Sequence, residues 1–468
     1  MNLDFDPETM RRMGELALQA VVDHLAQLPD APRSNLDHAE EIVRALREGP
    51  PENGTEFEQL LRFIMHEVIP VSINTPHPSY LAYIPGGGLY PSALADFIAS
   101  ATNRFAGAWF AAPAASRLEA NVLEWFAQWM DYPSSARGIL TSGGSLANFS
   151  AIVAARKHHL GDDLCQGTIY MSNQTHHSLI KAAMLAGIPE KNIRLLPVGD
   201  RFKAIPETFE QAIEQDRKNG LRPFMLIGNA GTTNTGAIDP LEALADIARK
   251  HQLWFHVDGA YGGFFRLTDE GRQKLCGIEQ SDSVVLDPHK GLFVPYGTGS
   301  LVVKEGERLR RAHMLEAEYL QDHDVPEGEV NPADYSPELS RFYRGLRVWL
   351  PLKLYGVRAF RAALQEKLDL ARELYQKFKQ EPGFEVLNEP ELTVTAFRYR
   401  PPHGDIDAFN RQLLQAINRS KKLFLASTLL NGQFVIRTCV LSFRTHRPEI
   451  EAAFEVIRYY AHKLASQM

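Results

Sequence analysis

Residues 283–291 read SVVLDPHKG, an apolar segment that ends abruptly at Pro288 and is followed at once by His289 and Lys290. The apolar part is short and does not alternate with polar residues, which is typical of a strand buried on both faces of a parallel sheet. In open α/β sheets, binding sites gather at the carboxyl ends of the strands. The stretch therefore predicts a buried strand with a histidine and a lysine at its functional end.

Six further segments of this kind alternate with helical patterns between residues 77 and 304. They are Gly138–Leu140, Thr168–Met171, Ile193–Val198, Phe224–Asn229, Trp254–Val257 and Gly299–Val303. Apolar strands separated by helices favour a mostly parallel sheet that is covered on both faces. We therefore predict the fold class α/β, with a seven-stranded sheet in one large domain that spans residues 77–345.

The two ends of the chain differ from this central region. Residues 1–76 show three helical patterns broken by prolines, which make a poor core by themselves. We expect them to form an arm that packs on something larger, a dimer partner being one candidate. Residues 346–468 start with a helical run at 346–367 and continue with two strand patterns and a last helix. This order predicts a small C-terminal α+β domain.

The connection at 316–339 is polar and acidic, and it contains three prolines and one glycine. A connection of this length inside a compact region is usually a mobile functional loop or a disordered one. We assign it to the large domain as a mobile loop.

The composition excludes several classes of protein. Of 468 residues, 44% are hydrophobic and 23% are charged, and 50 lysines and arginines against 57 acidic residues give a net charge of −7. This balance offers no general attraction to nucleic acid or to an anionic membrane, and no apolar run reaches the roughly 20 residues that span a bilayer. The acidic start is not a secretory signal, and three widely spaced cysteines favour a reducing compartment. We expect a soluble, cytoplasmic protein.

A second motif surrounds the strand predicted at 254–257. The residues WFHVDGAYGG at 254–263 place His256 and Asp258 two positions apart, so their side chains share one face of the strand. An aspartate there can keep a pyridine nitrogen protonated, and the small residues after it let a flat ligand approach. A metal site built from His256, Asp258 and His289, or a plain hydrogen-bonded strand end, suits the same residues.

Three more polar stretches follow predicted strands. At 141–148 the residues TSGGSLAN open a helix and suit a phosphate, although a plain turn with Ser145 as N-cap explains the pattern as well. After the next strand, His176 either stacks on an aromatic cofactor or belongs to a surface pair with His177. The stretch GTTNTG at 231–236 places hydroxyls around the same cavity or is only a polar turn.

The positions of the five motifs indicate that they belong to one site. Each follows a predicted strand, so all are expected at one edge of one sheet. Together they offer a phosphate cradle, a stacking imidazole and an anion for a ring nitrogen. Lys290 adds an amine that can form a Schiff base with an aldehyde, although a solvated loop lysine is the simpler explanation of that residue alone. The set is the complement that pyridoxal 5'-phosphate requires.

This ordered set resembles the pyridoxal-phosphate group II decarboxylases, the family of aromatic-L-amino-acid decarboxylase and glutamate decarboxylase. The resemblance covers nearly the whole chain and rests on PSYLAY at 78–83, Leu118-Glu119, His176, HVDGAY at 256–261 and DPHK at 287–290. It implies the aspartate-aminotransferase-like fold (PLP-dependent transferase fold type I) and an obligate homodimer with exchanged N-terminal helices. It also implies an amino acid substrate, a pyridoxal 5'-phosphate cofactor and active sites at the subunit interface.

The resemblance implies roles for individual residues as well. Lys290 looks like the lysine that forms the internal aldimine, Asp258 like the partner of the pyridine nitrogen and His176 like the histidine that stacks on the ring. The other cofactor contacts implied are Gly144, Ser145, Thr233, Ala260 and His289. The chain departs from the pattern at Asp287, where aromatic decarboxylases often have asparagine. A second negative charge is unfavourable beside a phosphate, which puts a direct phosphate contact by that residue in doubt.

In this family a loop tyrosine is linked to protonation of the substrate Cα, and Tyr335 matches it better than Tyr319. The presence of both Tyr335 and His176 favours simple decarboxylation over the oxidative, aldehyde-forming reaction. The positions that match or neighbour the substrate wall of aromatic decarboxylases are Tyr83, Ile84, Pro85, Phe105 and Trp109. They imply an apolar pocket for an aromatic or bulky apolar L-amino acid.

Other functions stay open. A pyridoxal-phosphate aldehyde synthase or lyase on the same fold, a metal-dependent hydrolase and a catalytically silent binding protein are the alternatives to a decarboxylase. Among decarboxylases, the glycines at 86–88 and Gly107 predict a wider or differently lined pocket. Arg104 neighbours the same wall, which keeps an acidic substrate such as glutamate open.

Overall fold

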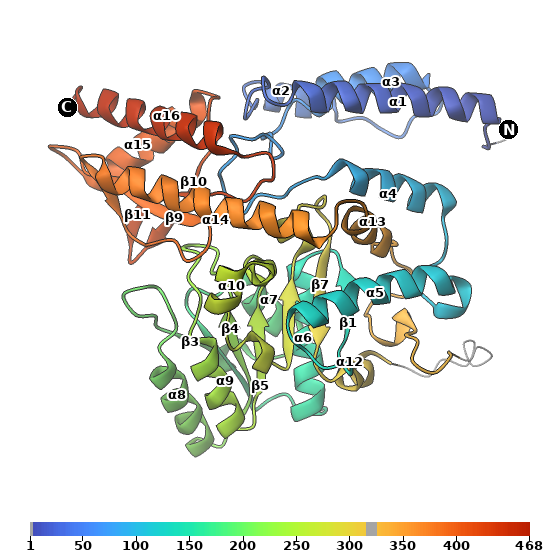
Figure 1. Ribbon diagram of the computed structural model, residues 1–468, viewed down its shortest axis with the longest axis vertical. Coiled ribbons are helices and arrows are strands. Elements are labelled where there is room, and N and C mark those ends of the chain that lie inside the picture. Colours follow the sequence, from blue (N-terminus) through green and yellow to red (C-terminus); the bar gives the residue numbers. More distant parts are fainter. Residues whose placement is uncertain (1–2, 315–324) are drawn as a thin grey trace.

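The structure is a computed structural model that describes residues 3–314 and 325–468. Figure 1 shows a large sheet with its helices in the lower part of the view, a smaller sheet with long helices at the upper left, and the N-terminal helices along the top. The C-terminal helix and the N-terminal helices therefore lie on the same side of the large sheet.

Seven strands form the large sheet, in the order β1-β7-β6-β5-β4-β2-β3. Their bounds are β1 Arg137–Thr141, β2 Gly167–Ser172, β3 Ile193–Leu196, β4 Arg222–Asn229, β5 Trp254–Asp258, β6 Ser283–Leu286 and β7 Gly299–Val303. β7 runs antiparallel to its neighbours β1 and β6, and the remaining pairs are parallel. The seven predicted strands are all present, and the predicted α/β class with a mostly parallel sheet is confirmed.

Helices cover both faces of this sheet because successive strand residues point to opposite sides. Along β2, for example, Ile169 and Met171 join one apolar cluster and Tyr170 joins the other. The first face packs on α6 (Gly144–His159), α7 (His177–Leu185) and α12 (Gly306–His313), and the second on α5 (Pro113–Trp129), α8 (Pro206–Lys218) and α9 (Leu241–Lys250). The strands are consequently apolar on both faces, as their sequences predict.

A second, antiparallel sheet has the strand order β10-β11-β9-β8. Its strands are β8 Phe384–Val386, β9 Val394–Tyr399, β10 Ala426–Leu430 and β11 Gln433–Cys439, and it packs on α14 (Val357–Gln380), α15 (Ile406–Arg419) and α16 (Arg447–Ala465). The helical run predicted at 346–367 was wrong in one respect, because it is two helices, α13 (Gly345–Tyr355) and α14. Gly356 takes a φ of 72° between them, and this left-handed conformation ends the first helix.

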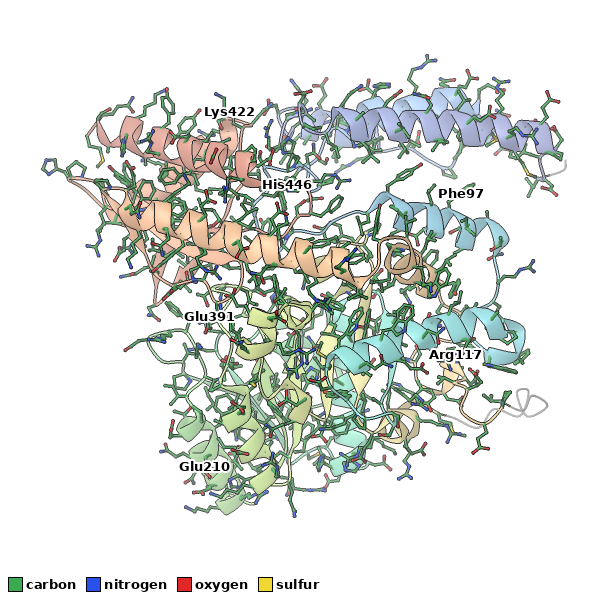
Figure 2. The ribbon with its side chains drawn as sticks, in the orientation of Figure 1. Phe97, Arg117, Glu210, Glu391, Lys422 and His446 are labelled. Carbon is green, nitrogen blue, oxygen red and sulfur yellow. The ribbon has the colours of Figure 1, made fainter. Side chains whose placement is uncertain are left out.

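The N-terminal helices bury little in a single chain. The helices α1 (Pro7–Gln27), α2 (Ala39–Ala45) and α3 (Phe57–Phe63) contain no buried residue. Large apolar side chains that stay exposed on and beside them include Leu18, Val21, Val22, Phe63 and Ile64. Phe97 (Figure 2), on α4 (Tyr90–Thr102), is also 66% exposed. Within the described residues, no helix combines the length and the apolar character that a membrane span requires.

Candidate active site

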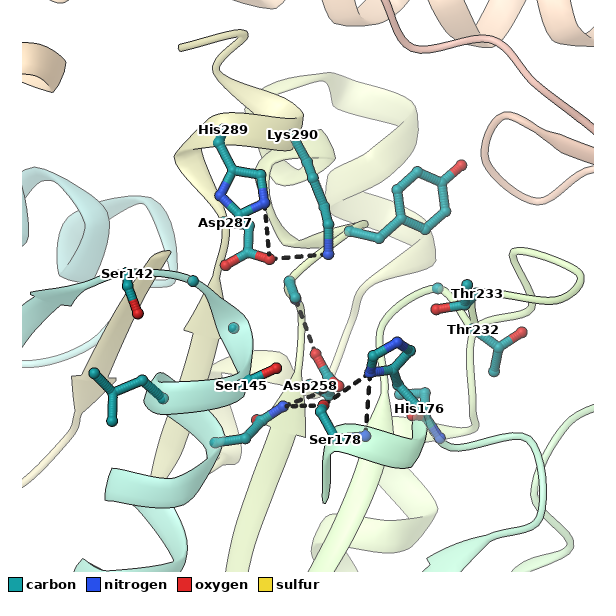
Figure 3. Close-up of a pocket in the computed structure, with 18 residues that line it drawn as sticks. Ser142, Ser145, His176, Ser178, Thr232, Thr233, Asp258, Asp287, His289 and Lys290 are labelled. Carbon is teal, nitrogen blue, oxygen red and sulfur yellow. Dashed lines mark hydrogen bonds and ion pairs between the residues drawn. The ribbon is translucent and has the colours of Figure 1, made fainter. Parts of the chain in front are cut away.

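A cavity of about 360 Å³ opens at the carboxyl edge of the large sheet, beyond the ends of β1, β2, β4, β5 and β6 (Figure 3). The positions that the sequence predicts as cofactor contacts and that line this cavity are Gly144, Ser145, His176, Thr233, Asp258, Ala260, His289 and Lys290. Parallel strands end at a common edge, so residues up to 146 positions apart in the chain converge there.

Lys290 reaches the cavity from a very short helix. β6 ends at Leu286, and α11 (Pro288–Gly291) starts almost at once, since the backbone angle of proline suits the first turn of a helix. Lys290 Nζ lies 2.9 Å from Asp287 Oδ2. Burial lowers the pKa of Lys290, but the nearby anions, Asp287 above all, raise it by more in total. The pKa of Lys290 is therefore shifted upward. The amine is therefore held as an ammonium in the cofactor-free chain.

Asp287 is the least solvated charged group of the cavity. It is 1% exposed, and its Oδ1 has no hydrogen-bond partner among the described residues. Its Oδ2, besides contacting Lys290, lies 3.6 Å from His289 Nε2. A Cβ atom at Gly144 would approach this carboxylate to 3.0 Å, and one at Gly299 to 2.8 Å. Glycine at both positions thus makes the space for a carboxylate beside the N-terminus of α6.

Asp258 and His176 face the cavity from neighbouring elements. Asp258 ends β5, and its Oδ1 accepts the backbone N–H of Ala260 at 3.1 Å. His176 precedes α7, and its Nδ1 accepts the hydroxyl of Ser178 at 2.8 Å and the N–H of Ser178 at 3.3 Å. Burial lowers the pKa of His176. Its ring is therefore mostly neutral at neutral pH, with the proton on Nε2.

This set of groups fits pyridoxal 5'-phosphate. The first turn of α6, a helix of 16 residues, lines the cavity and offers backbone N–H groups for a phosphate. Lys290 could supply an amine for the aldehyde, Asp258 an anion for the ring nitrogen and His176 a flat ring for the pyridine face. The cavity also contains the unpartnered oxygen of Asp287, a group that the cofactor would have to accommodate.

The metal site considered from the sequence does not form. His256 is fully buried, with Nδ1 2.7 Å from Ser283 Oγ and Nε2 3.0 Å from Asn148 Oδ1, so neither nitrogen is left for an ion. In the described part of the chain, the cluster that meets the spacing of a metal site is a different one. It consists of Glu210 (Figure 2), Glu214 and His251, on α8 and just after α9.

The predicted substrate-wall residues do not line the cavity in a single chain. Tyr83 is 57% exposed and Phe105 is 43% exposed, whereas Ile84 and Trp109 are half-buried and Pro85 is buried. None of these five positions is therefore a lining residue of the cavity, and Tyr83 and Phe105 are left open to solvent.

Among the described residues, the loop tyrosine Tyr335 is also absent from the cavity lining. Tyr335 follows the turn at Pro332–Asp334 and packs against the apolar cluster under α6 and α12, with Arg137 and Arg310 nearby. Tyr319 and most of the first half of the predicted loop lie outside the described residues.

Sequence reasoning missed Arg437, a buried cation close to the cavity. Arg437 lies on β11 and is 3% exposed, and its Nη2 is 3.0 Å from the carbonyl oxygen of Tyr83. Its Nε has no hydrogen-bond partner among the residues that the structure describes. Burial lowers its pKa, and the groups that oppose this effect are the Cys439 thiol and nearby phenols, among them Tyr261, which lines the cavity. An isolated arginine within the apolar strand QFVIRTC is the signal that could have revealed it.

Comparisons with known proteins agree on one family. Residues 40–400 match the pyridoxal-dependent decarboxylase conserved domain. The aromatic-L-amino-acid decarboxylase of Bacillus atrophaeus is 34% identical, over 96% of this chain and 95% of its own. The phenylacetaldehyde synthase of Arabidopsis thaliana is 29% identical over 98% of both chains. The crystal structure of Oryza sativa TDC with PLP and tryptamine superimposes with a TM-score of 0.94, at 28% identity and over 99% of both chains.

The burial of His256 predicts a specific loss of stability in acid. Burial lowers its pKa from 6.5 to about 3, so the unfolded chain binds a proton that the folded chain refuses as the pH falls below about 6.5. Between about pH 7.5 and about pH 5.5, the wild type should lose about 1.4 kcal/mol more stability than His256→Gln. Urea unfolding of both cofactor-free proteins at the two pH values measures the difference. Equal losses would contradict it.

Proposed function

The chain belongs to the pyridoxal-dependent decarboxylase family and is a pyridoxal-phosphate-dependent carboxy-lyase, and we propose that it converts an aromatic or bulky apolar L-amino acid into its amine and carbon dioxide. The observation that carries the proposal is the single cavity into which Lys290, Asp258, His176 and the first turn of α6 converge. The curated relatives named for aromatic substrates, across nearly the whole chain, support the substrate class.

Several groups that line the cavity have a task in this reaction. The first turn of α6, with Gly144 and Ser145, would hold the cofactor phosphate, and His289 lies beside it. Asp258 would hold a proton at the pyridine nitrogen, while His176 would cover one face of the ring. Thr233 and Ala260 would border the same ring. When bound, pyridoxal 5'-phosphate accepts the electron pair that stays at the substrate Cα when the carboxylate group leaves as carbon dioxide.

Arg437 is suited to bind the carboxylate of the substrate. A buried guanidinium is costly unless an anion pairs with it, and the pKa of Arg437 is shaped by a thiol and phenols rather than by a carboxylate. Its unpartnered Nε and its proximity to Tyr261 leave it able to receive an anion at the edge of the cavity. We assign it to orienting the bond between the substrate Cα and its carboxylate.

The active enzyme is proposed to be a cytoplasmic homodimer with its site at the subunit interface. The exposed apolar side chains of the N-terminal helices support this, since they need a further surface to cover them. The substrate-wall residues support it too, because Tyr83 and Phe105 remain open to solvent in one chain. The three cysteines of the chain are free, in keeping with a reducing compartment. The proposed domain boundaries are 76/77, between the N-terminal arm and the large cofactor domain, and 345/346, between the large and the small domain.

A second candidate function is decarboxylation coupled to oxidation, which yields an aldehyde. The relative named phenylacetaldehyde synthase, with 29% identity over 98% of the chain, favours it. The two reactions part after carbon dioxide has left: in the first, the substrate Cα receives a proton, and in the second it is oxidised by dioxygen. The proton donor at that point therefore decides the product, and Tyr335 is our candidate for it.

Cofactor attachment and product analysis test the proposed function together. The purified protein should be yellow with pyridoxal 5'-phosphate, and borohydride should fix the cofactor on Lys290, as peptide mass spectrometry would show. Lys290→Ala should lose both attachment and activity, whereas Lys181→Ala, an exposed lysine, should keep them. In a screen of L-amino acids, aromatic substrates should give amine and carbon dioxide. A colourless protein with stoichiometric zinc would overturn the assignment.

Tyr335→Phe should divert the product from amine to aldehyde. Removal of the phenol hydroxyl takes away the proposed proton donor to Cα, so amine formation should fall about 100-fold or more while aldehyde and peroxide rise. Parallel assays of amine, aldehyde and peroxide measure the partition. Tyr355→Phe, on the exposed end of α13, is the matched control and should behave as the wild type. Undiminished amine without aldehyde would refute the role of Tyr335.

Asp287→Asn should speed the capture of the cofactor near neutral pH. Schiff-base formation needs the neutral amine of Lys290, and Asp287 raises the pKa of that amine. Without the Asp287 carboxylate, burial is opposed only by Asp258 and Tyr296, so the pKa of Lys290 falls. A fall of one pKa unit should raise the capture rate about tenfold, and the pH profile of capture should move to lower pH. Stopped-flow absorbance after mixing cofactor-free protein with cofactor measures the rate. Asp282→Asn, outside the cavity, is the control, and equal rates in Asp287→Asn and wild type would contradict the prediction.

A further inference from the structure

Asn148 lies at the meeting point of the groups around the cavity. It is 1% exposed on α6, and its Oδ1 is 3.0 Å from His256 Nε2. Its Nδ2 is 3.4 Å from Asp258 Oδ2 and 3.5 Å from Ser178 Oγ. One side-chain amide therefore contacts the carboxylate assigned to the ring nitrogen and the hydroxyl that binds His176.

Behind His256 the network continues away from the cavity. His256 on β5 pairs with Ser283 on β6 in the register of the two parallel strands, and its Nδ1 is 2.7 Å from Ser283 Oγ. Trp254 Nε1 lies 2.8 Å from the same oxygen. Trp254, His256 and Ser283 are fully buried, and none of them lines the cavity. The sheet thus contains a line of polar groups that ends at Asp258.

The chemistry of the donors gives this line one direction. The Trp254 indole can only donate, so Ser283 Oγ accepts from it and keeps its own hydroxyl hydrogen available for His256 Nδ1. Burial lowers the pKa of His256 to about 3, so the ring is neutral and its single proton is on Nε2. That proton is donated to Asn148 Oδ1, which leaves the two hydrogens of the amide nitrogen for the oxygens of Asp258 and Ser178.

The last step reaches His176. Ser178 accepts from the amide of Asn148 and donates its hydroxyl hydrogen to His176 Nδ1, at 2.8 Å. The backbone N–H of Ser178 already requires an acceptor at His176 Nδ1, and the Asn148 amide reinforces the same tautomer through the Ser178 hydroxyl. The reverse orientation of Asn148 would place its oxygen against the Asp258 carboxylate, and two acceptors repel each other in a buried site.

We propose that Asn148 is a positioning residue through which Trp254, Ser283 and His256 hold Asp258 as an oriented carboxylate and His176 in its Nε2-protonated form. This inference rests on the proposed function, since Asp258 and His176 are assigned there to the cofactor ring. The hydroxyl of Ser283 supports this direction of the relay from outside the cavity, by donating to His256 Nδ1. Its removal would free His256 to adopt the other tautomer and Asn148 to turn.

Ser283→Ala tests the relay from a position that contacts no ligand. We expect the dissociation constant for pyridoxal 5'-phosphate to rise about tenfold and kcat to fall while KM stays unchanged. The pH titration of the visible absorbance of the bound cofactor should also shift, because the Asp258 carboxylate is less firmly held. Ser300→Ala is the matched control: Ser300 is equally buried on neighbouring β7 but donates to Leu286 O, outside the relay.

A pair of substitutions at His256 separates the relay from simple packing. His256→Gln retains an amide that can donate to Asn148, and it should keep the wild-type cofactor dissociation constant and absorbance titration at neutral pH. His256→Leu fills a similar volume without a donor and should show the defects of Ser283→Ala. The thermal unfolding midpoints of the cofactor-free variants report on folding separately, so a variant that fails to fold is recognised. The comparison of His256→Gln with His256→Leu then tests the relay itself.

The outcomes distinguish the relay from the proposed function. Wild-type values of the dissociation constant, the absorbance titration and kcat in both Ser283→Ala and His256→Leu would overturn the relay. Equal defects in His256→Gln and His256→Leu would overturn it as well, because the donor would then be irrelevant. A wild-type protein that binds the cofactor but decarboxylates no amino acid would refute the proposed function, and the two cofactor-binding measurements would still judge the relay.

Discussion

A parallel sheet covered by helices on both faces leaves polar side chains little room except at the carboxyl ends of its strands. In this chain that constraint organises everything else. The strands β1, β2, β4, β5 and β6 are mostly apolar, and polar residues gather where they end, so these residues share one cavity. The lysine at the end of β6 and the aspartate at the end of β5 are brought together by this geometry and not by proximity in sequence.

The polar groups that are buried in the sheet, or in the helix α6 packed on it, obey a stricter rule. His256, Ser283 and Asn148 are buried, and each has hydrogen-bond partners that match its donors and acceptors. In surroundings of low dielectric constant, a buried hydrogen-bond network with an unpaired group costs free energy. A network whose groups are all paired is rigid. Rigidity is what a carboxylate under a cofactor ring needs, which gives these buried groups a reason beyond packing.

Some charged groups at the cavity are paired within the chain, and others are proposed to be paired by bound ligands. Lys290 and Asp287 form a close pair in the cofactor-free chain, whereas Arg437 is a buried cation for which an anion is proposed to come with the substrate. The surface is incomplete in a comparable way, since apolar side chains on the N-terminal helices and Tyr83 near the cavity remain uncovered. We propose that a second copy of the chain covers both the N-terminal helices and Tyr83.

Much of the fold follows from local pattern: the seven large-sheet strands, the helices between them and the polar residues after each strand are all visible in the sequence, because apolar periodicity and strand ends are local properties. The break at Gly356, the strands β8 and β10, and the helix α15 were not foreseen, since a short or half-exposed element carries a weak periodic signal. Asn148, Ser283 and Arg437 gain their significance from partners 27 to 354 positions away. Which donor meets which acceptor depends on strand register and helix packing, and these are set by the burial of the whole core rather than by any local stretch of residues.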